Sequence, residues 1–264
     1  MNRIIKNIFK QSNLYAGVVP LQILGIYSIV HLFTGVVASW WLIATLIGFI
    51  LIAFLGVAAG YHRYCSHRNF RVGPIAKTFM FWCGVLSAQG SPIFWATLHK
   101  GYHHRYSDKE KDPHSPNDGF WHSYIWWMFK LDEKDYTDTW TSVLHLLKDK
   151  IALFFHKHYL AILWISNIVF ALISIDLWLY AIILPSFLTF HQYSLQTSVT
   201  HYRKLGYINK DVGDNSVNII WLWPLTFGEA WHNNHHSDPK NPNFRKCWWE
   251  LDPTFWIIKL IRID

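Results

Sequence analysis

Two long stretches without basic side chains constrain the fold of this chain more than any other feature. All 24 Lys and Arg residues fall in three segments, residues 3–10, 63–157 and 203–262. The gaps between these segments, residues 11–62 and 158–202, contain one acidic side chain, Asp176. Each gap has room for two apolar helices of about 20 residues, the length that crosses a bilayer. The sequence therefore predicts an integral membrane protein.

Each gap is interpreted as a helical hairpin that returns to the side it left. The four transmembrane helices of this all-α fold are predicted at residues 16–37, 41–60, 159–175 and 177–195. Basic residues concentrate on the cytoplasmic side of membrane proteins. We therefore expect a single membrane domain, residues 1–264, whose amino terminus is cytoplasmic. A cytoplasmic helical cap would comprise residues 61–158 and 201–264.

Other features of the composition exclude alternative classes. The net charge of +7 follows from this positive-inside bias, and the basic residues form no dense run, so no nucleic-acid partner is expected. The three cysteines, Cys65, Cys83 and Cys247, are widely spaced, which predicts a reducing compartment and no disulfide framework. No cleavable signal peptide is expected. Residues 74–98 are predicted as a broken helix on the membrane surface, because a fifth span would place histidines on opposite faces.

Nine of the 16 histidines form clusters that this topology brings to one side of the membrane. They are His62, His67, His99, His103, His104, His201, His232, His235 and His236. Each is expected at or just past the cytoplasmic end of a span. Neutral imidazole suits iron, zinc and copper. Nine converging imidazoles are too many for one ion and predict two.

The spacing suggests how the ligands divide between two ions. His99 and His103 are i, i+4 on a helix and can point one way, whereas His104 is turned by about 100° and can reach a second ion. His232, His235 and His236 repeat this pattern. Structural zinc would favour thiolates. A carboxylate-bridged di-iron bundle needs two Glu-x-x-His motifs, and this chain has one. A nitrogen-rich two-iron site that activates oxygen fits best.

Several motifs resemble those of membrane fatty-acyl desaturases of the stearoyl-CoA (delta-9) type. The last of them, with the letters WHNNHH, is the most specific. The similar segments are residues 60–68, 95–104, 108–116, 213–216 and 226–236. His201 stands at the family's additional ligand position, so all nine ligand positions are histidine. The second motif departs from the acyl-CoA enzymes, because it is H-x3-HH rather than H-x2-HH. Thr197 stands where the family usually has an asparagine that contacts one iron through water.

The resemblance implies that two irons per chain activate O2 and that a cis double bond, at the delta-9 position, is inserted into a saturated long-chain acyl substrate. The acyl donor would be an acyl-CoA or an acyl-lipid. Two electrons must come from a separate protein (a ferredoxin, a rubredoxin or a b-type cytochrome), since no flavin, haem or iron–sulfur motif is present. Glu229 and Asp112 are candidates to orient ligand imidazoles, and Thr197 could hold a water.

Candidate substrate contacts come from two regions. Phe54 and Ile50 lie on the same face of the second span as His62, and one of them is expected to close an acyl tunnel, unless this face is ordinary helix packing. Gln89 and Arg68 are candidates to meet the polar head of the acyl donor, although the positive-inside bias also explains Arg68.

Two other functions remain open from the sequence. The first is a di-iron membrane hydroxylase or ketolase of fatty acids, alkanes or sterols. The second is a non-enzymatic metal-binding or transport protein, which would place ionisable ligands inside the spans.

Overall fold

The computed structural model describes residues 11–35, 37–131 and 140–264, and these residues are mostly helical. Within them the only strand pairing consists of three isolated bridges, such as Tyr207 with Asn218. The prediction of an all-helical chain is confirmed. The predicted cytoplasmic segment at residues 3–10 and part of the predicted cap, residues 132–139, lie outside the described residues.

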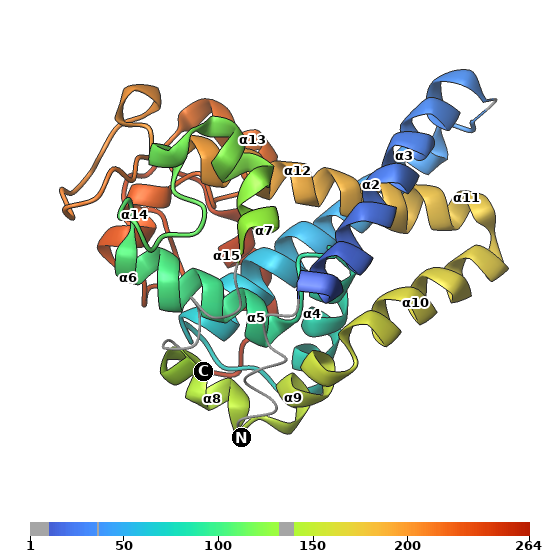
Figure 1. Cartoon of the computed structure of the whole chain (residues 1–264), viewed down its shortest axis with the longest axis horizontal. Coiled ribbons are helices and arrows are strands. Elements are labelled where there is room, and N and C mark those ends of the chain that lie inside the picture. The colour runs from blue at the N-terminus through green and yellow to red at the C-terminus, as the bar shows by residue number, and fades with distance from the viewer. Residues whose placement is uncertain (1–10, 36, 132–139) are drawn as a thin grey trace.

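Long helices form one end of the molecule, which we call the stem (Figure 1). They are α2 (Gln11–Thr34), α3 (Trp40–Phe49) with its continuation η1 (Ile50–Ser66), α10 (Tyr159–Ile173), and the consecutive α11 (Ile175–Trp178), η7 (Leu179–Ile183) and α12 (Leu184–Val199). The segments 15–34 and 40–66 are each long and apolar enough to cross a membrane. Residues 150–157 and 159–173 together would form a third such span, bent by 72°.

The helix that begins at Trp40 is longer than predicted. It continues to Ser66, so His62 lies inside it rather than after it, and His67 is the residue that ends it. A basic residue, Arg63, lies in its last turn and is buried among carboxylates of the cap. The charge pattern placed the end of the helix too early because a buried, paired cation looks the same in sequence as one at a membrane surface.

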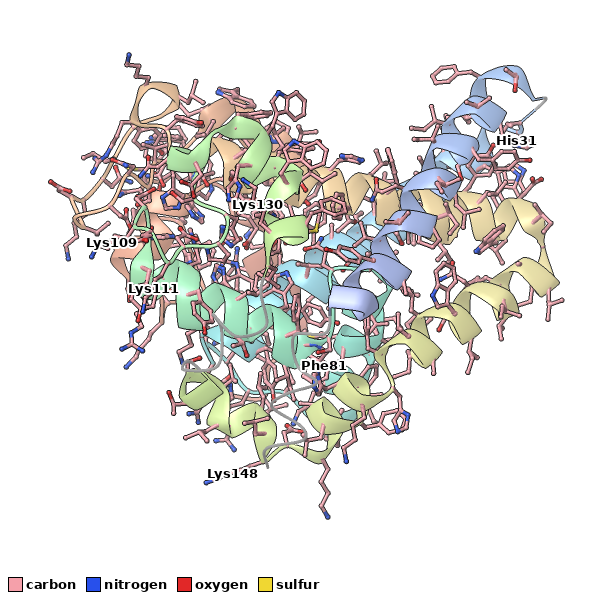
Figure 2. All side chains as sticks on the ribbon, in the orientation of Figure 1. His31, Phe81, Lys109, Lys111, Lys130 and Lys148 are labelled. Atoms are coloured by element: carbon pink, nitrogen blue, oxygen red, sulfur yellow. The ribbon has the colours of Figure 1, made fainter. Side chains whose placement is uncertain are left out.

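We call the other end the cap (Figure 1); it contains the last residues of η1, 62–66, and a set of short elements. They are α4 (Pro74–Leu86), α5 (Pro92–Ala96), η2 (Thr97–His103), α6 (His104–Tyr106), η3 (Pro116–Asp118), η4 (His122–Trp126), α7 (Trp127–Lys130), η6 (Trp140–Val143), α8 (Leu144–Leu147), α9 (Lys150–Lys157), η8 (Arg203–Leu205), η9 (Ile220–Leu222), α13 (Trp223–Thr226), α14 (His232–Ser237) and α15 (Pro253–Ile261). The labelled lysines of Figure 2 all lie on the cap, whereas His31 lies near the far end of the stem.

The predicted broken helix at residues 74–98 is present as α4 and α5, separated at Ser87–Ser91. The Ser91 side chain accepts the backbone N–H of Phe94 and so begins α5. Helix α4 packs closely on η1, where a Cβ added to Gly56 would lie 2.5 Å from the backbone nitrogen of Gly84. This close approach holds the end of α4 against η1. The connection from α4 to α5, and the histidines that follow α5, are positioned relative to η1 as a result.

Candidate metal centre

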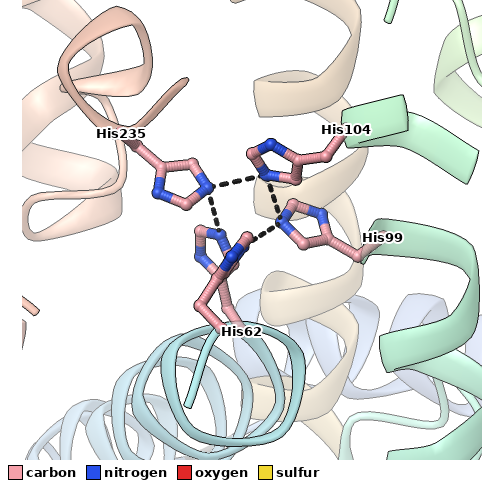
Figure 3. Close-up of side chains that lie close together, drawn as sticks. His62, His99, His104 and His235 are labelled. Carbon is pink, nitrogen blue, oxygen red and sulfur yellow. Dashed lines mark hydrogen bonds between the residues drawn. The ribbon is translucent and has the colours of Figure 1, made fainter. Parts of the chain in front are cut away.

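The nine predicted histidines meet in the cap as two groups. Within each group, one ring nitrogen from every member lies within 4.8 Å of the others. We call them the five-histidine group (His62, His67, His99, His104 and His235) and the four-histidine group (His103, His201, His232 and His236). Figure 3 shows four members of the first group turned toward one another from η1, the η2–α6 segment and α14.

The division of the second motif differs from the prediction. His99 joins His104, with their Nε2 atoms 3.0 Å apart, and His103 joins the other group. The cause is the winding of η2, a π-type helix with i→i+5 hydrogen bonding, which brings residues five apart onto one side. The third motif follows the α-helical expectation, because His232 and His236 share one group and His235 joins the other.

Ring nitrogens of the five-histidine group face each other at hydrogen-bonding distance. The Nε2 of His235 lies 2.9 Å from that of His62 and 2.8 Å from that of His104. His62 uses Nδ1 to donate to the carboxylate of Glu229, which leaves a lone pair on its Nε2. Lone pairs that converge in this way are the ligand arrangement that a cation requires, so the donor set fits a metal ion.

The four-histidine group has the same character. His201 and His232 approach with their Nε2 atoms 3.1 Å apart. The Nε2 atoms of His103 and His236 are buried and have no hydrogen-bond partner among the residues that the structure describes. Buried ring nitrogens without partners are costly, and a bound cation would satisfy them.

Burial keeps most of these imidazoles neutral. Desolvation is the main cause that lowers the pKa of His67, His99, His104, His232 and His235 well below the usual range. The pKa of His236 is lowered to about 4 for the same reason. Neutral imidazole is the form that binds metal. His103 differs: burial would lower its pKa, but the charge of Asp112 raises it.

Carboxylates bind the outward-facing nitrogens of four of the nine histidines. Both carboxylates that were predicted to orient imidazoles contact one, since Asp112 accepts from Nδ1 of His103 at 3.0 Å and Glu229 accepts from Nδ1 of His62. Two further pairs were not predicted, His201 with Asp108 and His236 with Asp214. Such pairs fix the tautomer and orientation of ligand imidazoles. The motifs at residues 108–116 and 213–216 contain these aspartates and were the available signal for them.

The role of Arg63 was also missed by the sequence interpretation, like the pairs made by Asp108 and Asp214. Its side chain is fully buried and donates to Glu229 at 2.7 and 3.0 Å and to Asp252 at 2.8 and 3.0 Å. Arg63 thereby links η1 to the start of α15 and holds the carboxylate that contacts His62. The adjacent histidine motif gave no indication of this role, because both carboxylates are distant in sequence.

A largely apolar cavity opens beside both groups and encloses about 840 Å³, including its mouth. Two histidines of each group reach it. Its lining residues are His62, Gln89, Phe94, Trp95, Leu98, His99, His103, His114, Trp127, Met128, Phe190, Tyr193, Ser194, Gln196, Thr197, Glu229 and His232. An apolar space of this kind fits an aliphatic chain beside the two histidine groups.

The candidate substrate residues do not all meet this cavity. Gln89 lines it and accepts a hydrogen bond from Trp95 at 3.2 Å. Arg68 is exposed and is not among the lining residues, nor is half-buried Ile50. Phe54 is buried and stacks on Phe227 at 4.2 Å between ring centroids, as in ordinary packing.

Thr197 and His114 complete the polar part of the lining. Thr197 donates its hydroxyl hydrogen to the carbonyl of Tyr193 at 2.6 Å, one turn earlier in α12. His114 was not predicted as a site residue. Its ring lies 4.7 Å from that of His103, and both rings lie beside the buried carboxylate of Asp112.

The chain is similar to known proteins over most of its length. Residues 38–261 match the family model described as fatty acid desaturase. An sn-1 stearoyl-lipid 9-desaturase of Anabaena variabilis is 34% identical over 214 residues, 79% of this chain and 76% of that protein. Delta-9 acyl-lipid desaturase 1 of Arabidopsis thaliana is 32% identical over 222 residues, 79% and 68% of the two chains. Acyl-CoA 5-desaturase AL21 of Anemone leveillei is 30% identical over 233 residues, 87% and 70%.

Proposed function

The chain belongs to the fatty acid desaturase family, and is therefore an oxidoreductase; we propose that it inserts a cis double bond at carbon 9 of a saturated, long-chain acyl group. The observation that carries this proposal is the apolar cavity that touches histidines of both groups. The position of the bond is supported by the relatives whose names specify carbon 9.

The nine histidines would hold two iron ions, one in each group. Bound iron would supply the binding and reduction of O2 that the removal of two hydrogens from unactivated methylenes requires. The all-histidine donor set supports iron over structural zinc, which is usually bound with thiolates. The electrons would come from a separate donor protein.

The protein itself would position the ligands and exclude water. Asp112 and Glu229 hold the Nδ1–H groups of His103 and His62, so that each presents Nε2 to its group. The indole of Trp95 stacks on His99 at 4.9 Å between centroids, and both side chains line the cavity. Thr197 lines the cavity close to His201 in sequence and would accept a hydrogen bond there, since its own hydrogen is given to Tyr193.

The acyl donor would be a membrane lipid. The acyl-lipid relatives are the more similar ones, and the H-x3-HH motif departs from the acyl-CoA pattern. Gln89, rather than Arg68, would contact the polar end of the substrate. Its side-chain carbonyl oxygen is held by a hydrogen bond from Trp95. Phe54 and Ile50 would limit the chain only indirectly, through the packing of η1 on its neighbours.

We further propose that the stem crosses the bilayer four times, with α11 to α12 as the fourth span and the cap in the cytoplasm. The charge-free stretches and the apolar outer faces of the stem support this topology. In a Cys247→Ser background, which leaves only the buried Cys65 and Cys83, Asp176→Cys should react with an impermeant maleimide only from the non-cytoplasmic side. Labelling from the cytoplasmic side would exclude the topology.

The function can be tested in a host that lacks unsaturated fatty acids. Expression of the chain should restore growth. Mass spectrometry of the host's fatty acids, after addition of dimethyl disulfide across their double bonds, should locate the new bond at carbon 9. The variant His235→Ala, which removes one member of the five-histidine group, should make no alkene at equal expression. Hydroxylated chains without alkenes would contradict desaturation.

A further inference from the structure

The two histidine groups differ in the charges that hold them. In the four-histidine group, three of four imidazoles donate from Nδ1 to an aspartate. The pairs are His103 with Asp112 at 3.0 Å, His201 with Asp108 at 3.1 Å and His236 with Asp214 at 2.6 Å. In the five-histidine group, among the residues that the structure describes, His62 alone has a carboxylate partner, Glu229.

The charge of Glu229 is also shared, because its Oε1 accepts two hydrogen bonds from the buried guanidinium of Arg63. No lysine or arginine within the described ranges forms an ion pair with any of the three aspartates. The four-histidine group therefore lies beside three negative charges without direct cationic partners. The five-histidine group lies beside one, and that one is paired with a cation.

These differences bear directly on metal affinity. A carboxylate that accepts from the outer nitrogen of a ligand imidazole makes the ligand more basic, and its loss costs roughly 10–100-fold in affinity. Uncompensated negative charge nearby also attracts a divalent cation. The five-histidine group offers one additional neutral nitrogen. Three charged partners outweigh a single added neutral ligand.

We propose that the two groups bind metal unequally, the four-histidine group holding its ion more tightly, and that Asp108, Asp112 and Asp214 are the positioning residues that set the difference. This inference rests on the proposed two-metal site. It adds that the ions should be lost one at a time and always in the same order.

The test is graded removal of iron from the purified, iron-loaded protein with a ferrous chelator. Iron per chain is counted by mass spectrometry, and ⁵⁷Fe Mössbauer spectra identify which ion remains. The wild type should lose iron in two steps separated by at least about 10-fold in chelator concentration. At every intermediate chelator concentration the same one of the two Mössbauer signals should be the more depleted.

Isosteric variants assign the steps. Asp112→Asn and Asp214→Asn should each shift the resistant step by roughly 10–100-fold toward lower chelator concentration and leave the labile step unchanged. Asp211→Asn is the matched control, because Asp211 lies in the same loop as Asp214 but pairs with Arg203 at the surface. It should shift neither step.

Loss of both irons of the wild type in a single step would overturn the inference, and this readout needs no variant to fold. A shift of the labile step by the asparagine variants would overturn it as well. A protein that forms alkenes but loses both irons together would refute the inequality and leave the proposed function standing. A wild type that binds no second iron even when loaded with excess ferrous iron would refute the two-metal site, and the inequality with it.

Discussion

The stem exposes apolar side chains, whereas the cap buries polar and charged ones. The outer faces of the stem helices are apolar, and Phe33 and Leu172 are each 81% exposed. The cap buries charged and amide groups completely, and the side chains of Arg63, Glu250 and Asn233 are 0% exposed. The stem thus matches a lipid environment, whereas the cap is held together by an internal polar network.

This difference indicates which interactions determine the packing of each part. Lipid-facing helices gain little from burying apolar surface, so their association depends on close packing and a few hydrogen bonds, such as that between His31 and Tyr180 at 2.8 Å. In the cap, each buried polar group requires a particular partner. Substitutions should therefore have larger effects inside the cap than inside the stem.

The largest effect is expected from Arg63→Ala in the cap. Removal of this buried cation leaves Glu229 and Asp252 uncompensated, which costs about 3–5 kcal/mol for a buried ion pair. The variant should lose iron and aggregate on heating in detergent, as measured by iron content and size-exclusion chromatography. Lys246→Ala, which breaks an exposed pair with Asp238, is the control and should have little effect. Equal stability of the two variants would contradict the account of the cap.

A smaller effect is expected on the outside of the stem. Ile23 lies in the middle of α2 and is 65% exposed, so Ile23→Lys would place a charge in lipid at a cost of about 2.5–3.5 kcal/mol. The variant should be less abundant in alkali-extracted membranes. Ile208→Lys, on an exposed residue of the cap, should insert normally. Normal insertion of both variants would show that the outer face of α2 does not contact lipid.

The smallest effects are expected from substitutions of two asparagines, one in the cap and one in the stem. In the cap, Asn234 donates to Phe244 O and Glu250 and accepts from Asn209 and Asn218, all within 3.0 Å. Asn234→Ala leaves buried groups unsatisfied and should cost about 1–3 kcal/mol.

In the stem, Asn167 accepts a hydrogen bond from Trp178 at 2.8 Å. Asn167→Ala should cost only about 0.6 kcal/mol, the average for such bonds between membrane helices. Thermal unfolding in detergent measures both variants, and a larger loss for Asn167→Ala would reverse the comparison.

The stem was more predictable from the sequence than the cap. Charge-free apolar stretches encode helices directly, whereas the end of the helix at Ser66 depends on the burial of Arg63 by distant residues. The histidines that meet in the two groups could be named from their clustering in the sequence. Their division between the groups could not, because the π-type winding of η2 is not visible in the motif. Asp108 reaches His201 across 93 positions, and only the folded chain brings them together.

The central claim is that the cap holds an acyl chain with carbon 9 beside the two histidine groups. Cells that express the chain can be supplied with stearate carrying two deuterium atoms at each of carbons 9 and 10. The account predicts a cis octadecenoate that retains two of the four deuterium atoms. An alkene that retains all four, or a hydroxylated chain that retains three, would contradict it.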